Sequence, residues 1–465
     1  MSRRSAFVPK SLRRTAPRPI IILVTDPGPD PDDVKVLIAA TVAHIRGDIV
    51  LRCVVCNGGG APSARARLAR CVLDHLRAYE VPVGVGSAGE TRTPYSYEYN
   101  LDGYHDVDNA RLIDGTALID SVLQNALPRS LTWLLISSLR DFVDAVAREE
   151  ELVCSKTKRV AIMGGLQRVR RELIVPDPDC SPNTQETRLL AANAWDSWEP
   201  DSSQNNVFDR QAASVAYSWC FRRGVPMIVT SRHVVPPIPM ELAISFASRT
   251  CCPLLKYLAA AQEEGLKGLW IRLCHGELPA RCSKRWYFES FCGTDASTFS
   301  ARDYDGLGPD ADMTRYLHGS LKPYDVVCLM TVLPATETLF RGLADSVFAG
   351  GAVHHLLHDP AKATVGSAQV QQLLYKTYQH ASAITASHTG DELAGEKVHV
   401  LRGIECPRWK GCSSHHVITD VGTNVPDGTT AEQPTTAPDN GVAIRAWDGA
   451  EEKCPASRWK HALAT

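Results

Sequence analysis

The chain alternates between short apolar runs and longer segments in which apolar residues recur with a helical period. The first apolar run, residues 20–24, is rich in β-branched side chains and ends at a turn containing Pro and Gly, as is typical of a buried strand. Another apolar stretch follows Asp33 and predicts a helix that begins near Asp30 to Asp32. A polar turn therefore joins a predicted strand to a predicted helix at residues 25–33.

The same alternation continues along most of the chain. Strands are predicted at residues 48–56, 81–86, 130–136, 158–163 and 225–231, and helices at residues 63–79, 212–223 and 366–386. Alternating strands and helices are accommodated most simply by a parallel sheet. We therefore predict an α/β fold in which a mostly parallel sheet with a Rossmann-like core is flanked by helices, with extended loops at residues 90–111 and 166–203.

The two ends of the chain lack this pattern. Residues 1–18 are rich in Arg and contain no acidic residue and no apolar core, so they do not form a secretory signal. A transit peptide would share this composition, but we favour a disordered basic leader. The pattern is lost after Arg402, and residues 421–440 are rich in Thr, Pro, Gly and Asp, so residues 391–465 are predicted to form a largely disordered tail. Residues 19–390 are then expected to form one catalytic domain.

The bulk composition excludes some classes of partner. A hydrophobic content of 44% is ample for a large core, and a formal charge of -2 gives no electrostatic reason to expect nucleic acid as a partner. No apolar run approaches the roughly 20 residues that a membrane span needs, so no membrane association is expected. The 15 Cys are scattered without zinc-finger spacing, which favours reduced core residues in a cytoplasmic protein.

Four carboxylates occur within the turn after the first strand, at Asp26, Asp30, Asp32 and Asp33. In open α/β sheets, ligands bind at the carboxyl ends of the strands, where this turn lies. Acids in the first turn of a helix can also cap it or offset its dipole. Capping explains one or two of them, but not Asp26 together with Asp32 and Asp33. A hard cation such as Ca²⁺ or Mg²⁺, which prefers oxygen ligands, is the better explanation.

The same turn resembles a family signature. Thr25-Asp26-Pro27-Gly28, followed by Asp32-Asp33, is similar to the Asp-Thr-Asp-Pro-Gly-x-Asp-Asp motif of the inosine-uridine-preferring nucleoside hydrolases. Val24 stands where the family has its leading Asp, and two extra residues precede the Asp pair. The resemblance implies that Asp26, Asp32 and Asp33 bind one Ca²⁺ ion and that Asp30 belongs to an insertion.

Two later segments resemble the parts of the family that complete the metal shell. Residues 130–141 resemble a strand and turn in which a backbone carbonyl is a ligand, and Ile136 takes that position, with Ser137 as the alternative. Residues 321–330 resemble the family's His-Asp-Pro motif. Asp325 corresponds to the metal-binding Asp. Tyr324 replaces the His that protonates the leaving group, and a phenol with an ordinary pKa near 10 is a poor acid for that role.

Other positions resemble the substrate-binding residues of the family. Asn57 follows the second strand, and Met163 begins a Met-Gly-Gly motif after a later strand. Asn205, with Asn206 as the alternative, matches an Asn that binds ribose. The family's Glu nearby is replaced by Ser203 or Gln204.

Two further features near this segment remain open. Asp209 is interpreted as a helix cap rather than a ligand. An aromatic stretch at residues 266–299 could stack on a base or simply pack in the core.

The resemblance implies a metal-dependent hydrolase that cleaves the N-glycosidic bond of ribonucleosides to ribose and free base. Asp26 would accept a proton from the water that attacks C1′, through an oxocarbenium-like transition state. The expected partner is a small ribonucleoside, and a homo-oligomer is compatible with the sequence. Two alternatives remain: a nucleoside-binding protein of the same fold without turnover, and a different metal-dependent hydrolase. The second lacks a Gly-x-x-x-x-Gly-Lys phosphate cradle.

Overall fold

A computed structural model describes residues 17–168, 198–248, 250–278, 280–293, 304–340, 342–359, 361 and 365–392. Residues 1–16 of the predicted leader and residues 393–465 of the predicted tail lie outside this described part. The chain divides into two compact units, Met1–Val398 and His399–Thr465, and all described residues belong to the first. Among the described residues, no helix combines the length and the apolar character that crossing a bilayer requires.

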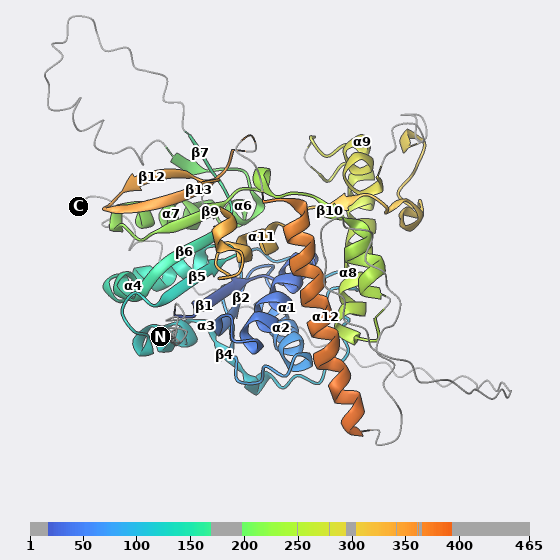
Figure 1. Cartoon of the computed structure of the whole chain (residues 1–465). Coiled ribbons are helices and arrows are strands. Elements are labelled where there is room, and N and C mark those ends of the chain that lie inside the picture. Colours follow the sequence, from blue (N-terminus) through green and yellow to red (C-terminus); the bar gives the residue numbers. More distant parts are fainter. Residues whose placement is uncertain are drawn as a thin grey trace, which may run out of the picture. The chain divides into compact units, whose positions relative to one another are not determined.

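The centre of the first unit is a nine-stranded sheet whose neighbouring strands follow the order β12-β13-β9-β6-β5-β1-β2-β3-β4 (Figure 1). All neighbours pair in parallel except β12 and β13, which are antiparallel. The predicted mostly parallel α/β fold is therefore confirmed. The strands are β1 (Ile20–Thr25), β2 (Val50–Cys56), β3 (Val83–Val85), β4 (Leu112–Asp114), β5 (Leu131–Leu135), β6 (Thr157–Met163), β9 (Met227–Thr230), β12 (Asp345–Ala349) and β13 (Ala352–Leu357).

Helices cover both faces of the sheet because its central strand is apolar on both sides. Along β1, Ile21 and Leu23 belong to one buried core, and Ile22 and Val24 belong to the other. The first core contains residues of α1 (Asp32–Ile45), α2 (Pro62–His75), α8 (Pro253–Cys274), α11 (Tyr324–Met330) and α12 (Ser367–Glu392). The second contains residues of α3 (Gly115–Asn125), α4 (Arg140–Lys156) and α7 (Arg210–Arg223).

Short elements connect these layers. Two small antiparallel pairs are formed by β7 (Leu166–Arg168) with β8 (Trp198–Pro200), and by β10 (Ile238–Pro239) with β11 (Ser320–Leu321). The remaining short helices are α6 (Gln204–Phe208), α9 (Lys284–Tyr287), η1 (Asn109–Arg111), η3 (Arg232–Val234), η4 (Leu242–Phe246), η5 (Phe288–Cys292), η6 (Met313–Tyr316) and η7 (Glu337–Phe340).

The sequence pattern missed the edge strands of the large sheet and the separate pair of β7 and β8. The strand β4 is only three residues long, and the predicted loop at residues 166–203 contains β7 and β8 at its two ends. The hairpin of β12 and β13 turns through Gly350 and Gly351, whose φ angles are 57° and 81°. Positive φ at both turn residues is the geometry of the tightest hairpins. Its strands carry exposed apolar residues such as Phe348, so the pattern lacked the usual alternation.

The order of the strands creates a crevice next to β1. The chain adds β2, β3 and β4 on one side of β1, then returns to place β5, β6 and β9 on the other side. The connections after β1 and β5 lead to α1 and α4, which contribute to opposite cores. In such sheets, the point where the strand order reverses is where ligands bind.

Candidate functional site

Four carboxylates meet at the carboxyl end of β1, and we call Asp26, Asp32, Asp33 and Asp325 the acidic cluster. Asp33 Oδ1 accepts a hydrogen bond from the backbone N–H of Asp26 at 2.9 Å and another from the Thr25 hydroxyl. The backbone N–H of Asp325, at the start of α11, donates to Asp32 Oδ2 at 2.9 Å. Residues that are almost three hundred positions apart therefore converge on one point.

The acids do not act as an ordinary helix cap. Pro31 precedes α1, and no side chain caps that end of the helix. Asp30 Oδ1 accepts a hydrogen bond from the backbone N–H of Asp32 at 3.0 Å, so this exposed residue stabilises the turn locally. Its role agrees with its placement in an insertion.

The acidic cluster has more negative charge than its surroundings favour. Burial raises the pKa of Asp26 to about 6, although the nearby Arg65 lowers it. Burial likewise raises the pKa of Asp32 to about 7 against the lowering effect of Lys35. The pKa values of Asp33 and Asp325 are raised well above their ordinary range, first by burial and then by the neighbouring carboxylates. A positive charge placed among these groups would lower all four pKa values.

Arg65 supplies one positive charge that the sequence analysis missed. It is 3% exposed, and its Nη1 lies 2.8 Å from Asp26 Oδ2 and 2.7 Å from the carbonyl oxygen of Asn57. A Cβ atom at Gly58 or Gly59 would come within 2.8 or 2.7 Å of this guanidinium. The glycines after β2 are therefore needed so that Arg65 can reach Asp26. The signal in the sequence was a charged residue three positions before buried Leu68 on α2.

Lys35 supplies a second buried charge. It is 1% exposed, and its Nζ lies 2.8 Å from Gln262 Oε1 on α8 and 3.5 Å from Asp32 Oδ1. The sequence indicated a buried charge at Lys35 only through its position within the apolar run of α1. Two buried cations face four carboxylates, so the fully ionised cluster keeps a formal charge of about −2.

The donor chemistry of the acidic cluster fits a divalent cation. Carboxylate oxygens with excess negative charge are the ligands that Ca²⁺ prefers. Ile136 follows β5, and its N–H donates to the carbonyl oxygen of Val24 at 3.0 Å, so it lies at the same edge of the sheet. Nevertheless, in the described part of the chain, no group of three or more His, Cys, Asp or Glu side chains is arranged to hold a metal ion. Arg65 binds one oxygen of Asp26, so it competes with a cation for that oxygen.

Asn57, predicted to contact substrate, is held within the protein. It is fully buried, and its Nδ2 donates to Asp141 Oδ2 at 2.6 Å and to the carbonyl oxygen of Ser138 at 3.1 Å. Its Oδ1 is buried without a hydrogen-bond partner among the described residues, as are Arg65 Nε and Ser137 Oγ. A buried polar group without a partner costs about 1–3 kcal/mol. These three atoms, near the ends of β2 and β5, are therefore candidates for contact with a ligand.

The other predicted ribose-binding residues lie near the carboxyl end of β6, which is two strands from β1 in the sheet. Asn205 is half-buried, and its Nδ2 donates to the carbonyl oxygen of Met163 at 3.0 Å. Asn206 is fully buried, donates to the carbonyl oxygen of Gly165 at 2.9 Å and accepts a hydrogen bond from the Tyr217 hydroxyl at 3.1 Å. Asn206 thus stabilises the loop, and Asn205 is the better placed of the two.

Asp209 caps α7, as predicted. Its Oδ1 accepts a hydrogen bond from the backbone N–H of Ala212 at 2.8 Å. Arg140 binds its other oxygen, Oδ2, so both oxygens have structural partners.

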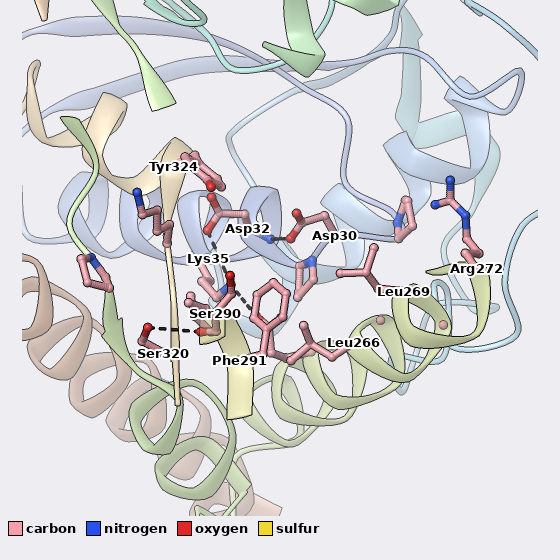
Figure 2. Close-up of a pocket in the computed structure, with 18 of the residues that line it drawn as sticks. Asp30, Asp32, Lys35, Leu266, Leu269, Arg272, Ser290, Phe291, Ser320 and Tyr324 are labelled. Carbon is pink, nitrogen blue, oxygen red and sulfur yellow. Dashed lines mark hydrogen bonds and ion pairs between the residues drawn. The ribbon is translucent and has the colours of Figure 1, made fainter. Parts of the chain in front are cut away.

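A cavity of about 620 Å³ opens beside the acidic cluster (Figure 2). Asp32 is the cluster member that lines it, together with Asp30 and Lys35. Residues from distant segments form the rest of its wall, including the aromatic residues Tyr95, Tyr97, Trp286, Phe291 and Tyr324. Trp286 and Phe291 belong to the aromatic stretch at residues 266–299, whose role the sequence left open, and both line this cavity.

Tyr324 lies at the edge of the cavity, and Figure 2 shows its side chain next to Asp32. Burial and then the charges of Asp32 and Asp30 raise the pKa of its hydroxyl to about 12. The phenol therefore stays protonated at neutral pH. It can donate a hydrogen bond, but it is a weak acid.

No family model and no curated protein matches the chain. Among solved structures, the chain is similar to the type III effector protein XopQ complexed with adenosine diphosphate ribose, with 23% sequence identity and a TM-score of 0.55. The alignment covers 79% of this chain and 94% of the XopQ chain. The effector protein XOO4466 is 22% identical over the same shares of the two chains, with a TM-score of 0.57. An inosine-guanosine nucleoside hydrolase aligns at 12% identity, 78% and 99% coverage and a TM-score of 0.45, a likeness too weak to support a conclusion. The chain therefore has the fold of the two effector proteins, and its place in the inosine-uridine-preferring family stays a prediction.

Proposed function

We propose that the protein binds the ribose of a ribonucleoside at the acidic cluster and hydrolyses its N-glycosidic bond with the help of one divalent cation, Ca²⁺. The observation that supports this most is the convergence of Asp325 on Asp26, Asp32 and Asp33 at the point where the strand order reverses. Four acids with raised pKa values form a site suited to hydroxyl groups and a cation.

The residues of the chain have chemical properties that suit this reaction. Asp26 has one oxygen paired with Arg65, and its Oδ1 accepts no hydrogen bond from the described residues. With a pKa of about 6, it is mostly ionised at neutral pH and can accept a proton from water. The cation, when bound, would acidify that water. Asp26, Asp32, Asp33, Asp325 and the carbonyl of Ile136 are the proposed ligands.

The cavity beside Asp32 suits a base. Trp286 and Phe291 offer aromatic faces, on which any base can stack. The Tyr324 hydroxyl, protonated at neutral pH, could donate a hydrogen bond to the departing base. The related fold of XopQ, whose structure contains adenosine diphosphate ribose, lends support to a ribose-containing ligand for this chain.

A second candidate is a nucleoside-binding protein without turnover. The ion pair between Arg65 and Asp26 favours it, because a guanidinium 2.8 Å from the proposed base weakens that base and competes with a cation. The replacement of the family's Glu and His by Ser203 or Gln204 and by Tyr324 points the same way.

One experiment separates the two candidates. The protein is mixed with inosine, uridine or adenosine in Ca²⁺, and both free ribose and calorimetric binding are measured. We expect ribose release by the wild type and none by Asp26→Asn, whereas Asp310→Asn, in an exposed loop, should behave like the wild type. Binding without ribose release would favour the binding protein. The absence of both would refute the proposal, and full activity of Asp26→Asn would refute the assignment of the base.

A further inference from the structure

A second cavity, of about 260 Å³, lies at the carboxyl ends of β6, β9 and β13, and we call it the basic hollow. Arg168 ends β7, Arg232 begins η3 directly after β9, and His358 follows β13. The full lining consists of Leu166, Gln167, Arg168, Trp198, Asp201, Ser202, Ser231, Arg232, His233 and His358. Four of these ten side chains are cationic or can become so.

The described residues compensate the charge of the basic hollow only in part. Asp201 is the one carboxylate of its lining, and Asp201 Oδ1 already accepts hydrogen bonds from the backbone N–H of Ser203 at 2.8 Å and from Asn206 at 3.1 Å. Arg168 stacks over the ring of Trp198, with its guanidinium carbon 5.1 Å from the centroid. Such a contact orients a guanidinium without neutralising it.

Arg232 is held in place by a neutral residue. Its two terminal nitrogens donate to the carbonyl oxygen and the hydroxyl of Ser202, at 3.1 and 3.0 Å. His358, in contrast, has a carboxylate partner, because its Nε2 lies 3.2 Å from Asp345 Oδ2. Among the described residues, neither Arg168 nor Arg232 has a carboxylate partner, and both face the cavity. Guanidinium groups that face a cavity are frequent partners of phosphate oxygens.

The basic hollow is close to the acidic cluster but separate from the large cavity. In the sheet, β6 is two strands from β1 and β9 is three, or about 10 and 14 Å at the usual strand spacing. Tyr324 lines the large cavity and Arg232 lines the basic hollow, so the two cavities have different walls. The protein thus places an aromatic cavity, a set of carboxylates and a basic hollow at the carboxyl ends of neighbouring strands of one sheet.

We propose that the basic hollow is an anion subsite, which binds a phosphate or diphosphate carried on the 5′ carbon of the ribosyl ligand. This inference rests on the proposed function. If the 2′ and 3′ hydroxyls lie at the acidic cluster and the base lies in the aromatic cavity, the 5′ carbon is the remaining branch of the ribose. A phosphate there is repelled by the four carboxylates and attracted by Arg168 and Arg232. The volume of about 260 Å³ is ample for a phosphate group.

The test compares each nucleoside with its phosphorylated form. Binding of adenosine, inosine and uridine, of their 5′-monophosphates and of inorganic pyrophosphate to the full chain is measured by calorimetry. We expect the monophosphates to bind at least about tenfold tighter than the nucleosides, equal to about 1.4 kcal/mol. Arg232→Gln and Arg168→Gln should each remove most of this gain and leave nucleoside affinity unchanged. Arg222→Gln, at the exposed end of α7, is the matched control and should keep the gain.

The outcomes separate the two proposals. Nucleosides that bind as tightly as their monophosphates would overturn the anion subsite and leave the proposed function intact. A phosphate gain that survives both Arg variants would also overturn it. If no nucleoside binds or is cleaved, the proposed function fails, but pyrophosphate binding that both Arg variants abolish would still support the subsite. Arg232→Gln also loses contacts to Ser202, so Arg168→Gln provides the test if the first variant does not fold.

Discussion

The acidic cluster makes the stability of the cation-free protein depend on pH in an unusual direction. The pKa of Asp26 is about 6 in the folded protein against an ordinary value of 3.8, and that of Asp32 is about 7. The folded protein therefore holds these protons more tightly than the unfolded chain does. The resulting stabilisation is complete below about pH 4 and is lost as the pH rises through about 6 and then about 7.

The size of the effect follows from the pKa of Asp26. A difference of about two pH units corresponds to about 3 kcal/mol of unfolding free energy. Urea unfolding in a chelator should therefore give a clearly lower stability at pH 8 than at pH 5. Asp26→Asn removes one titrating group and lowers the repulsion on Asp33 and Asp325, so this variant should lose less stability over the same range.

The control and the cation give two further comparisons. Asp310→Asn, an exposed variant, should show the same pH dependence as the wild type. Added Ca²⁺ should stabilise the protein more at pH 8 than at pH 5, because protons compete for the same oxygens. An equal loss of stability in wild type and Asp26→Asn would refute the charge analysis. Identical curves with and without Ca²⁺ would refute the cation site.

Three other results are expected. Arg65→Gln breaks a buried ion pair and should lower the free energy of unfolding by about 3–5 kcal/mol. Arg67→Gln, two residues further along α2 with a half-buried side chain, is the control and should lower it by at most about 1 kcal/mol. Both are measured by urea unfolding, and equal losses would contradict the role of Arg65. Tyr324→Phe should lower the rate of ribose release by at least about tenfold at saturating substrate, and an unchanged rate would remove the hydroxyl from the reaction. Chelation by EDTA should abolish ribose release and Ca²⁺ should restore it; activity indifferent to EDTA would exclude a metal-dependent reaction.

The local elements around the site could be predicted because they depend on neighbouring residues. Apolar residues 20–24 and the start of α1 near Asp32 follow from periodicity and from Pro and Gly in the turn. Asp209 was identified as a cap because it precedes α7. The hairpin of β12 and β13 was missed because an edge pair is half exposed and alternates weakly.

The counter-charges of the site could not be predicted in the same way. Arg65 and Lys35 lie within helical apolar patterns, where a charged residue appears as an irregularity rather than a partner for an acid. The pairing of Arg65 with Asp26 requires the glycine turn after β2 to lie beside β1, and the bond from Lys35 to Gln262 requires α8 to pack against α1. Sequence spacing carries no information about either arrangement.

The sequence by itself determined the α/β class, the strand-turn-helix around Asp26 to Asp33 and the excess of carboxylates there, because all three depend on residues a few positions apart. A resemblance, not periodicity, connected Asp325 to them. Only the tertiary structure decided which charged residues lie together: Asp325 with Asp32, Arg65 with Asp26, and Arg168 with Arg232 in the basic hollow. The physical reason is that strand order brings together the ends of strands that are distant in the chain, and charge interactions depend on that distance in space.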